Sequence, residues 1–301
     1  MDKYNSRETI ANTTFWSTFF NHTKDGKKVI SYRMKRWILV LAIHLLFFLS
    51  FFIDLQVLEG TLNGSRFLGF HMIDIFTNMQ VVLATHHLPV NMIIGTVTII
   101  LVYLLVGGRS YCAWVCPYGI ISEVSEKLNS ILVKKKIIKK REFDHRVRYI
   151  FWLAFLLMSA FSGYLVFETF NVVGILSRMI VYGWSLAFLW VVAIFFIETF
   201  YSRRAWCTYV CPIGTTYGMI GKASALRIEW NDNCDHCMVC HDVCFENQVL
   251  EITKAKYDKQ REEKNITREY ITGADCTLCG RCIDVCHEDA LSFDFRLKSL
   301  V

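Results

Sequence analysis

Charged residues are nearly absent from four long stretches of this 301-residue sequence. The stretches are Trp37–Leu55, Val90–Gly108, Tyr149–Phe167 and Ile180–Phe200. Each has close to the roughly 20 apolar residues with which a helix crosses about 30 Å of hydrocarbon, and buried helices of soluble proteins are rarely so long and so poor in charge. This scarcity of charge argues against a globular helical core and predicts an α-helical membrane protein with four transmembrane helices.

Positive charge is scarce in the first and third loops between these stretches, which contain only Arg66 and Arg178. Lys and Arg are concentrated in residues 1–36 and 109–148 instead. Because positively charged loops stay in the cytoplasm, both termini and the middle loop are expected there, with the protein in the cytoplasmic (inner) membrane. The basic residues lie beside the membrane, so they explain the net charge of +6 without a nucleic-acid partner.

Cysteine is absent from the same two loops, and the first apolar stretch lacks a small-residue cleavage site. The first absence argues against a disulfide framework, since every cysteine lies where thiols stay reduced. The second argues against a cleaved signal peptide. The chain is expected to comprise a basic arm (1–36), a four-helix membrane domain (37–222) and a cytoplasmic tail (223–301) with eight of the twelve cysteines.

The tail contains the strongest motif, two cysteine runs of equal spacing. They read Cys234-x2-Cys237-x2-Cys240-x3-Cys244 and Cys276-x2-Cys279-x2-Cys282-x3-Cys286. In bacterial ferredoxins such runs hold two [4Fe-4S] clusters, and the fourth cysteine of each run ligates the other cluster. The sequence therefore predicts a small α+β ferredoxin-like domain with two clusters. Their expected ligands are Cys234, Cys237, Cys240 and Cys286 for one, and Cys276, Cys279, Cys282 and Cys244 for the second.

Zinc is the alternative, because it also accepts four thiolates at Cys-x2-Cys spacing. Zinc sites seldom use four consecutive cysteines in this order, and here the order occurs twice. Proline usually follows the fourth cysteine of a ferredoxin run, but Phe245 and His287 stand there. This alters the turn and removes no ligand. The charged stretch Lys254–Arg268 between the runs is expected to be a solvated insertion.

A second cysteine motif occurs twice, after the second and after the fourth apolar stretch. Arg109, Cys112, Cys116 and Pro117 recur at the same spacing as Arg204, Cys207, Cys211 and Pro212. Two predicted spans separate the copies, so both should have the same orientation, as in a parallel repeat about an axis along the membrane normal. The i, i+4 spacing predicts that each cysteine pair lies on one face of a helix.

Three interpretations of these four cysteines remain open. The repeat axis can bring both pairs together at the cytoplasmic membrane surface, where four thiolates would hold a third cluster or another thiophilic metal. The pairs can also act as reversible dithiols, or as structural cysteines at a helix end. Arg109 and Arg204 would stabilise thiolate charge in either functional case.

Two segments beside the spans are expected to be interfacial helices. Behind Pro117, apolar residues recur at helical spacing from Ile120 to Leu132 and a lysine cluster follows, which predicts a helix in the lipid headgroup region. The segment Phe67–Pro89 is apolar but interrupted by ionisable residues. It predicts an interfacial or re-entrant helix on the outer side.

A membrane-bound cluster protein needs an electron donor or acceptor nearby, and quinol is the abundant candidate. Quinol oxidation releases protons and needs a base. Ionisable residues at the membrane edge or inside a span are candidates by default. Here they are His71, Asp74, His86, His87, Glu168 and, inside the first span, His44. His87 and Asp74 are preferred for the quinol site, although outer residues would lie roughly 30 Å from the inner clusters. A deeper quinol site or an outer acceptor protein would remove this difficulty.

The sequence resembles the NapH-type membrane ferredoxins, a family with NapH-, MauN-, NosR- and CcoG-like members. The resemblance rests on the four spans, the Arg-x-aromatic-Cys-x3-Cys-Pro copies, His87-Leu88-Pro89 and the run from Cys276 to Cys286, and covers about residues 35–295. It implies a subunit of a quinol dehydrogenase complex. Such a subunit would oxidise menaquinol or ubiquinol and pass electrons, with a NapG-like ferredoxin partner, towards a periplasmic reductase.

An assembly factor is the rival expectation. A MauN- or CcoG-like protein would use its clusters to reduce a metal or thiol while another enzyme matures. Quinol-dependent bleaching of the clusters separates the two expectations. No flavin-attachment domain precedes the first span, which argues against a full NosR-type regulator, and no signalling domain supports a redox sensor.

Overall fold

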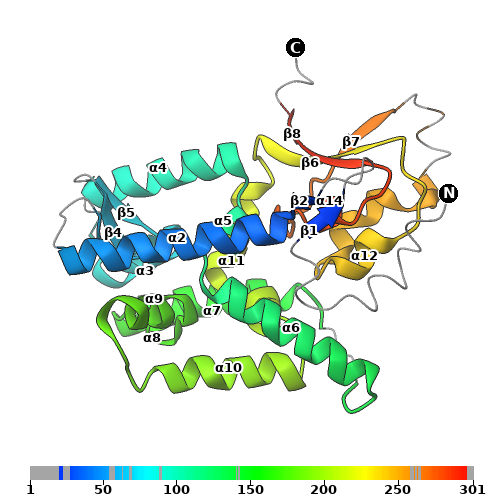
Figure 1. The fold of residues 1–301 in the computed structure, drawn as a ribbon. Coiled ribbons are helices and arrows are strands. Elements are labelled where there is room, and N and C mark those ends of the chain that lie inside the picture. Colours follow the sequence, from blue (N-terminus) through cyan, green and yellow to red (C-terminus); the bar gives the residue numbers. More distant parts are fainter. Residues whose placement is uncertain are drawn as a thin grey trace. The chain divides into compact units, whose positions relative to one another are not determined.

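The computed structural model describes residues 20–22, 28–53, 58–62, 64–67, 70–87, 90–139, 141, 143–257, 261, 263 and 266–296. The chain, drawn in Figure 1, divides into two compact units. The cysteine-rich unit comprises Met1–Leu39, Leu104–Trp114 and Ile220–Val301, and the helical unit comprises Val40–Tyr103 and Val115–Met219. Two earlier segments of the chain therefore share a unit with the cysteine-rich tail.

The helical unit consists mainly of helices, with one small antiparallel sheet. The helices are α2 (Tyr32–Ile53, which begins in the cysteine-rich unit), α3 (Ile75–Thr85), α4 (Val90–Val106), α6 (Tyr118–Lys134), α7 (Val147–Ser162), α8 (Val166–Phe170), α9 (Val172–Tyr182), α10 (Phe188–Phe200), the π-helical turn η2 (Trp206–Val210) and α11 (Pro212–Gly221). The sheet joins β3 (Leu58–Thr61), β4 (Gly64–Phe67) and β5 (Phe70–Ile73) in chain order. α10 packs on α6 and α9, and α3 packs on α7.

Among the described helices, α2 alone is both long and apolar enough to cross a membrane. α4, α7 and α10 are apolar but have only 17, 16 and 13 residues. Gly107 and Gly163 directly follow α4 and α7 with left-handed φ of 104° and 67°. Glycine adopts this conformation without a steric penalty, so both helices end before the predicted spans do.

The prediction of one continuous helix over residues 180–200 is wrong. The stretch divides into the end of α9, an irregular connection and α10. Gly183 follows α9 with a φ of 94°, and residues 184–187 are not α-helical. The apolar run continues through the break, which is why hydropathy did not indicate it.

The prediction of a helix over Phe67–Pro89 is wrong in its first part. Residues 70–73 form β5, and α3 begins only after Asp74. The Asp74 carboxylate accepts a hydrogen bond from the Thr77 backbone N–H at 3.1 Å, which satisfies one of the free N–H groups of the first turn. His86 ends the helix in the left-handed conformation, with a φ of 56°.

The structure extends the internal repeat beyond the cysteine motifs. α3 and α9 both have 11 residues, and both begin behind a buried cap, Asp74 in one and Asn171 in the other. Asn171 Oδ1 accepts from the Val173 N–H at 3.1 Å, much as Asp74 accepts from Thr77. After each short helix come a connection, an apolar helix and one Cys-x3-Cys-Pro copy. The repeating unit is therefore a capped short helix, an apolar helix and a cysteine motif.

The apolar helices of the helical unit expose many large hydrophobic side chains, although other apolar side chains of the unit are buried. The exposed ones include Leu41, Phe161 and Leu189, and Phe161 is 89% exposed. Polar side chains, including His44 and Glu198, are buried. Extended exposed apolar surface marks contact with a membrane or with another protein.

The helix predicted behind Pro117 is present as α6, and its polar face is the buried one. Glu123 and Glu126 are almost inaccessible to solvent, whereas Leu128 and Ile131 are exposed. The two acids therefore need partners inside the unit, because an unpaired buried charge is costly.

The cysteine-rich unit contains an antiparallel sheet of order β7-β6-β8. Its strands are β6 (Leu226–Asn231), β7 (Arg268–Tyr270) and β8 (Leu291–Phe295). The other elements are the pair β1 (Phe20–His22) and β2 (Lys28–Ile30), and the helices α5 (Ser110–Trp114), α12 (Val239–Val243), η3 (Asn247–Thr253), η4 (Ala255–Tyr257) and α14 (Arg281–Asp284). α12 and α14 pack together.

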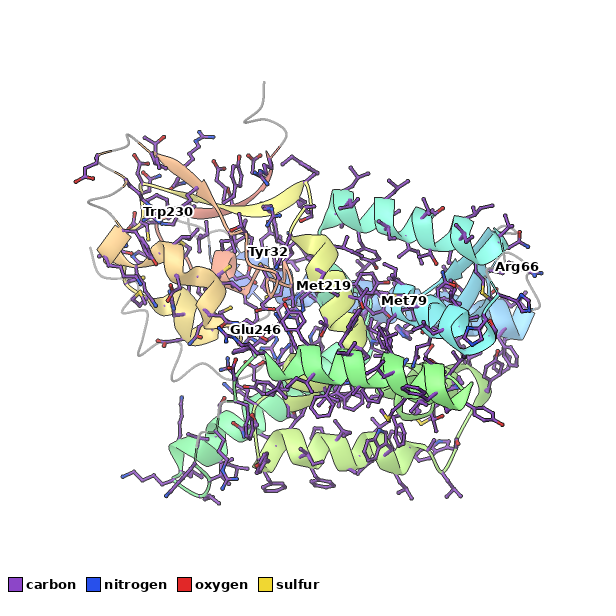
Figure 2. All side chains as sticks on the ribbon, turned by 180° about the vertical axis from the view of Figure 1, so that it is seen from behind. Tyr32, Arg66, Met79, Met219, Trp230 and Glu246 are labelled. Carbon is purple, nitrogen blue, oxygen red and sulfur yellow. The ribbon has the colours of Figure 1, made fainter. Side chains whose placement is uncertain are left out.

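One apolar cluster forms the core of this unit. It contains Ile228, Trp230, Leu250, Ile271, Leu278, Cys282 and Leu291. Trp230, labelled in Figure 2, pairs with Leu291 across β6 and β8. Cys234, Cys240, Cys244 and Cys276 pack against this cluster. Five of the eight thiols of the tail therefore lie in or against one apolar core.

The prediction that Lys254–Arg268 is a solvated insertion is wrong for Arg261, which is buried. Its guanidinium carbon lies 3.9 Å from the centre of the Trp230 ring, and Nη2 lies 2.7 Å from Glu269 Oε2. Arginine suits this position because its flat guanidinium can stack on an aromatic face and pair with a carboxylate at once. The insertion thus contributes a buried cation to the sheet.

Candidate iron-sulfur centres

The two cysteine runs of the tail share one backbone path. Left-handed residues occur at the second and fourth positions after the first cysteine of each run. They are His236 and Met238 in the first run, and Leu278 and Gly280 in the second, with φ of 56°, 63°, 52° and 73°. This conformation costs a non-glycine residue roughly 1–2 kcal/mol. Such strain persists where the surroundings demand it, which is expected of loops that wrap around a bound group.

The first set of thiols comprises Cys234, Cys237, Cys240 and Cys286. Burial, with a smaller contribution from the negative charge of the three other thiols, raises the pKa of Cys240 to about 11. Cys286 comes from the second run, so the structure brings thiols of both runs together here. The Ala290 backbone N–H donates a hydrogen bond to Cys286 Sγ at 3.2 Å.

The second set comprises Cys244, Cys276, Cys279 and Cys282, which line one pocket together with apolar side chains of the core. Burial, with a smaller contribution from the negative charge of Cys279, raises the pKa of Cys276 to about 12 and that of Cys244 above its usual range. Cys244 comes from the first run, so this set also joins the two runs.

Each set has the donors that a [4Fe-4S] cluster takes, four thiolates. Buried thiols with raised pKa stay protonated unless a metal displaces the protons, so metal binding and thiol ionisation are coupled here. Two such sets around one apolar core can supply two one-electron carriers shielded from water.

The segment 104–114 packs against the second cysteine run. Trp114 Nε1 donates a hydrogen bond to the Leu278 backbone carbonyl at 2.9 Å. Gly107 has a left-handed φ of 104°, which favours glycine, and a Cβ added there would meet the end of the Leu278 side chain. Cys112 lies on this segment, within α5. One Cys-x3-Cys-Pro copy is therefore tied to the loop that carries Cys276, Cys279 and Cys282.

Arg109, the arginine of the first motif copy, is buried beside the same loop. Its Nη1 lies 3.2 Å from Asp275 Oδ1 and 4.0 Å from Glu246 Oε1. Figure 2 labels Glu246 and Tyr32 in this unit. The guanidinium opposes the rise in the pKa of Cys276. Arg109 therefore acts on a thiol of the second set.

Gly280 lets α2 approach the second cysteine run. A Cβ added there would lie 2.6 Å from Cγ and 2.7 Å from Cβ of Tyr32, the first residue of α2. The Tyr32 backbone N–H also donates to Asp284 Oδ1 at 3.0 Å. The glycine is required both by its left-handed φ and by this contact.

The prediction that each Cys-x3-Cys pair lies on one helical face is wrong. In the first copy α5 ends at Trp114, before Cys116. In the second, the Cys211 N–H donates to the Trp206 carbonyl at 2.8 Å and closes the π-helical turn η2, and Cys211 itself is extended. A proline disfavours the helical conformation in the residue before it, so the Cys-Pro sequence ends both turns. π-helical turns are frequent at functional sites.

Three of the four motif thiols, Cys116, Cys207 and Cys211, belong to the helical unit, and Cys112 belongs to the cysteine-rich unit. Burial raises the pKa of Cys207 well above its usual value, and the charges of Glu198, Cys116 and Cys211 raise it further. A reactive dithiol needs a lowered thiol pKa. The surroundings of Cys207 therefore disfavour a free redox-active thiol.

Arg204, the arginine of the second copy, is held by the buried acids of α6. Its Nε donates to Glu126 Oε2 at 2.7 Å, and Nη2 lies 3.7 Å from Glu123 Oε1. It also opposes the rise in the pKa of Cys207. Both motif arginines thus anchor their copies through carboxylates, with a smaller effect on a nearby thiol.

Glu198 of α10 is a site residue that the sequence analysis missed. It is fully buried and accepts hydrogen bonds from Ser125 Oγ at 3.1 Å and from the Trp206 backbone N–H at 3.2 Å. It is the one acidic residue in the fourth apolar stretch. That isolation is a signal of function in a membrane segment and could have identified it.

The two preferred quinol residues do not converge. Asp74 and His87 lie at opposite ends of α3, which spans roughly 16 Å for 11 residues. Asp74 is buried and hydrogen-bonded to Tyr217 of α11, six residues after Cys211, whereas His87 is exposed. Burial raises the pKa of Asp74 to about 6. Asp74 therefore contacts the helix behind a cysteine motif, which was not expected of an outer residue.

The remaining quinol candidates are scattered. His44 is buried in α2, where its Nδ1 is hydrogen-bonded to the Val40 carbonyl at 2.7 Å. His86 is exposed, and the side chain of His71 lies outside the described residues. Glu168 lies on α8 beside Arg178, with 3.7 Å between Oε1 and Nη2.

Family comparisons agree with both kinds of cysteine motif. A family model described as a 4Fe-4S dicluster domain matches residues 233–290. Another, described as a 4Fe-4S binding domain, matches residues 88–140 and 182–231. Each of the two segments matched by this second model contains one Cys-x3-Cys-Pro copy.

The ferredoxin-type protein NapH of Haemophilus influenzae is 33% identical over 80% of this chain and 81% of its own length. The chain belongs to the NapH and MauN family of ferredoxin-type proteins. NapH of Escherichia coli is 29% identical over 89% of this chain and 92% of its own length. The methylamine utilization ferredoxin-type protein MauN of Paracoccus denitrificans is 33% identical over 64% of this chain and 69% of its own length. The family resemblance is confirmed, and this NapH/MauN-type chain is an iron-sulfur electron-transfer protein. No solved structure matches it.

Proposed function

We propose that this protein is a membrane-bound electron-transfer subunit that takes part in quinol oxidation and delivers the electrons to a NapG-like ferredoxin subunit and a periplasmic reductase. The observation that carries the proposal is the pair of four-thiol sets around one apolar core, in a chain whose other unit exposes apolar helices. Iron-sulfur clusters pass single electrons, and quinol is the abundant two-electron donor in the membrane.

We assign α2, α4, α7 and α10 to four membrane crossings, with both termini in the cytoplasm. The exposed apolar side chains and buried polar side chains of these helices support this assignment. The concentration of Lys and Arg in residues 1–36 and 109–148 supports the orientation. Helices of 13–17 residues cover only roughly 20–25 Å, so the flanking residues must complete three of the crossings.

We assign one [4Fe-4S] cluster to Cys234, Cys237, Cys240 and Cys286, and a second to Cys244, Cys276, Cys279 and Cys282. When bound, the clusters supply one-electron transfer. The chain holds them with thiolates, excludes water with the apolar core and places a buried cation, Arg109, beside the second set.

A third cluster at Cys112, Cys116, Cys207 and Cys211 is part of the proposal. The motif spacing supports it, and so does the 4Fe-4S family model that matches both copies. The raised pKa of Cys207 counts against the alternative of a free dithiol.

The contacts of segment 104–114 suggest the order of transfer. This segment carries Cys112 and packs on the loop of the second set through Trp114 and Arg109. Electrons would enter the tail at the second set and leave from the first, where Asp235 beside Cys237 is exposed.

An assembly factor is the second candidate, because a MauN relative matches at the same identity as a NapH relative, 33%, although over 64% rather than 80% of this chain. The test is anaerobic mixing of the purified full-length protein with menadiol, followed by visible absorbance of the clusters. Bleaching by menadiol, and recovery when a periplasmic acceptor protein is added, is the expected result. Clusters that dithionite reduces but menadiol leaves oxidised would overturn quinol oxidation and favour the assembly role.

A further inference from the structure

A pocket of about 970 Å³ opens in the helical unit where the ends of α3, α7 and α9 meet α8. Its size falls in the range of small-molecule sites. Glu168 and Arg178 provide charged groups in its wall. The strongly exposed aromatic residues Tyr164, Tyr182 and Trp184 surround it. Tyr and Trp prefer the boundary between lipid and water, so this pocket suits a ligand that enters from the membrane surface.

The polar groups of the pocket are held in place. Arg178 Nε donates to the Gly174 carbonyl at 3.2 Å, and its Nη2 lies 3.7 Å from Glu168 Oε1. The other carboxylate oxygen of Glu168 accepts from Asn171 Nδ2 at 3.2 Å. A ligand in the pocket would therefore meet an anchored carboxylate and a guanidinium side by side.

Aromatic packing connects this wall to the second cysteine motif. Phe167, next to Glu168, is fully buried and stacks on Trp206 with 6.4 Å between ring centres and 16° between planes. Trp206 is the residue before Cys207. Two stacked rings inside one unit therefore lie between the residue next to Glu168 and the residue before a motif thiol, which offers a path for electrons from this side of the pocket.

We propose that this pocket binds the head group of an isoprenoid quinol, with Glu168 as proton acceptor and Arg178 as hydrogen-bond donor to a ring oxygen. The proposal rests on the proposed function and gives it a site away from Asp74 and His87. The aromatic rim fits the ring, and the exposed apolar helices fit the isoprenoid tail.

The reaction balances with groups of this chain. Two O–H bonds of the quinol break and two carbonyls form, which releases two electrons and two protons. Glu168 takes one proton, and water at the open mouth of the pocket takes the other. The oxidant is the set of oxidised iron-sulfur clusters of this protein, each of which accepts one electron.

The test uses the full-length protein with its clusters and three pocket variants, Glu168→Gln, Arg178→Gln and Ala84→Phe. Asp144→Asn, which removes an exposed carboxylate outside the pocket, is the matched control. Menadiol-driven bleaching of the clusters should slow about 100-fold or more in Glu168→Gln, as expected on loss of a general base. Quenching of heptyl-hydroxyquinoline N-oxide fluorescence should need about tenfold more protein in Arg178→Gln, the 1.4 kcal/mol of one lost charged contact. It should need at least as much more in Ala84→Phe, because the larger side chain fills part of the pocket. Dithionite reduction should match wild type in all four variants.

The outcomes separate the site from the function. If menadiol does not bleach the wild-type clusters, the proposed function fails. If it bleaches wild type and all three pocket variants equally fast, the pocket is not the quinol site. A phospholipid that copurifies with wild type and is lost from Arg178→Gln, with bleaching unchanged, would show a lipid site instead and would also overturn the proposal. If one pocket variant loses its dithionite-reducible clusters, the other pocket variants decide the test, and Glu168→Asp, which keeps the base, should retain most of the rate.

Discussion

Arg109 Nη1 lies 3.2 Å from Asp275 Oδ1, and both residues are buried beside the second cysteine run. The arginine belongs to a motif that follows the second apolar stretch, whereas the aspartate directly precedes Cys276. One ion pair therefore joins the two kinds of cysteine motif in this chain. The positive charge of Arg109 also acts on any group that the second set of thiols binds.

Arg109→Gln should lower the reduction potential of the cluster at the second set. Removal of a buried cation makes an added electron less favourable, and net charge is one of the factors that set these potentials. The variant should also lose roughly 3–5 kcal/mol of stability, because Asp275 and Glu246 would be left as buried charges without this partner. Redox titration followed by electron paramagnetic resonance measures the potential. Arg203→Gln is the control, since Arg203 lies in the other unit, precedes the motif arginine Arg204 and also pairs with a buried carboxylate, that of Glu126. Equal potentials in wild type and Arg109→Gln would contradict the prediction.

Iron content should distinguish the three thiol groups. Cys282→Ala and Cys286→Ala should each lose about four irons, from different clusters, since a [4Fe-4S] cluster needs its thiolates. Cys207→Ala should also lose about four irons if the Cys-x3-Cys-Pro copies hold a cluster. Iron and acid-labile sulfide per chain give the answer. If wild type and Cys207→Ala both contain about eight irons per chain, the Cys-x3-Cys-Pro thiols hold no cluster. Zinc in place of iron would overturn the cluster assignment altogether.

Gly280→Ala should destabilise the cysteine-rich unit by more than about 1 kcal/mol. The new Cβ would need a left-handed φ of 73° and would lie 2.6 Å from Tyr32 Cγ. Tyr32 meets it with Cβ as well as with its ring, so a simple rotation of the side chain cannot relieve the contact. Thermal unfolding of the cluster-loaded protein is the measurement. Gly64→Ala is the matched control, because no atom of the residues that the structure describes lies within 4 Å of its added Cβ and its φ is not left-handed. Equal midpoints for the two variants would argue against the contact with Tyr32.

Asp74→Asn should stabilise the protein at neutral pH. Asparagine caps a helix as well as aspartate does, and the change removes a carboxyl whose pKa burial raises from 3.8 to about 6. A carboxyl whose pKa is higher in the folded than in the unfolded state ionises more readily in the unfolded state. Its ionisation as the pH rises therefore favours unfolding. Wild type should therefore lose stability relative to the variant as the pH rises from about 4 to about 6, and the difference should level off above that.

Thermal unfolding midpoints of wild type and Asp74→Asn across this pH range test the argument. Asp74→Ala, which lacks a cap, should be less stable than Asp74→Asn by about 1 kcal/mol at every pH. A difference between wild type and Asp74→Asn that does not change with pH would show that the carboxyl does not titrate in this window.

Local sequence rules predicted the cysteine-rich tail well and the helical unit less well. The spacing of Cys234 to Cys244 and of Cys276 to Cys286 indicated two loops, and the structure gives both the same left-handed positions. The family resemblance followed from the same motifs. Hydropathy found α2, α4 and α7, but it could not find the break at Gly183, because apolar residues continue on both sides of it.

Contacts between distant segments lay beyond these rules. The helical period predicted a helix in the lipid headgroup region and gave no reason to expect that its polar face is buried. Glu123 and Glu126 are buried because Arg204 lies opposite them. The i, i+4 rule failed at Cys211 because the following proline ends the turn. Asp74 was expected at the outer surface, and its contact with Tyr217 depends on how α3 and α11 pack, which no local pattern contains.

The cysteine-rich unit is assembled from the beginning, the middle and the end of the chain. During synthesis its sheet cannot close until β8, near residue 295, has left the ribosome, long after the first apolar helices are made. Tyr32, Gly107 and Trp114 can make their contacts only after the loop that carries Leu278 and Gly280 has been synthesised. Cys286 completes the first set of thiols, so cofactor delivery to this set can be completed only after that residue has been made.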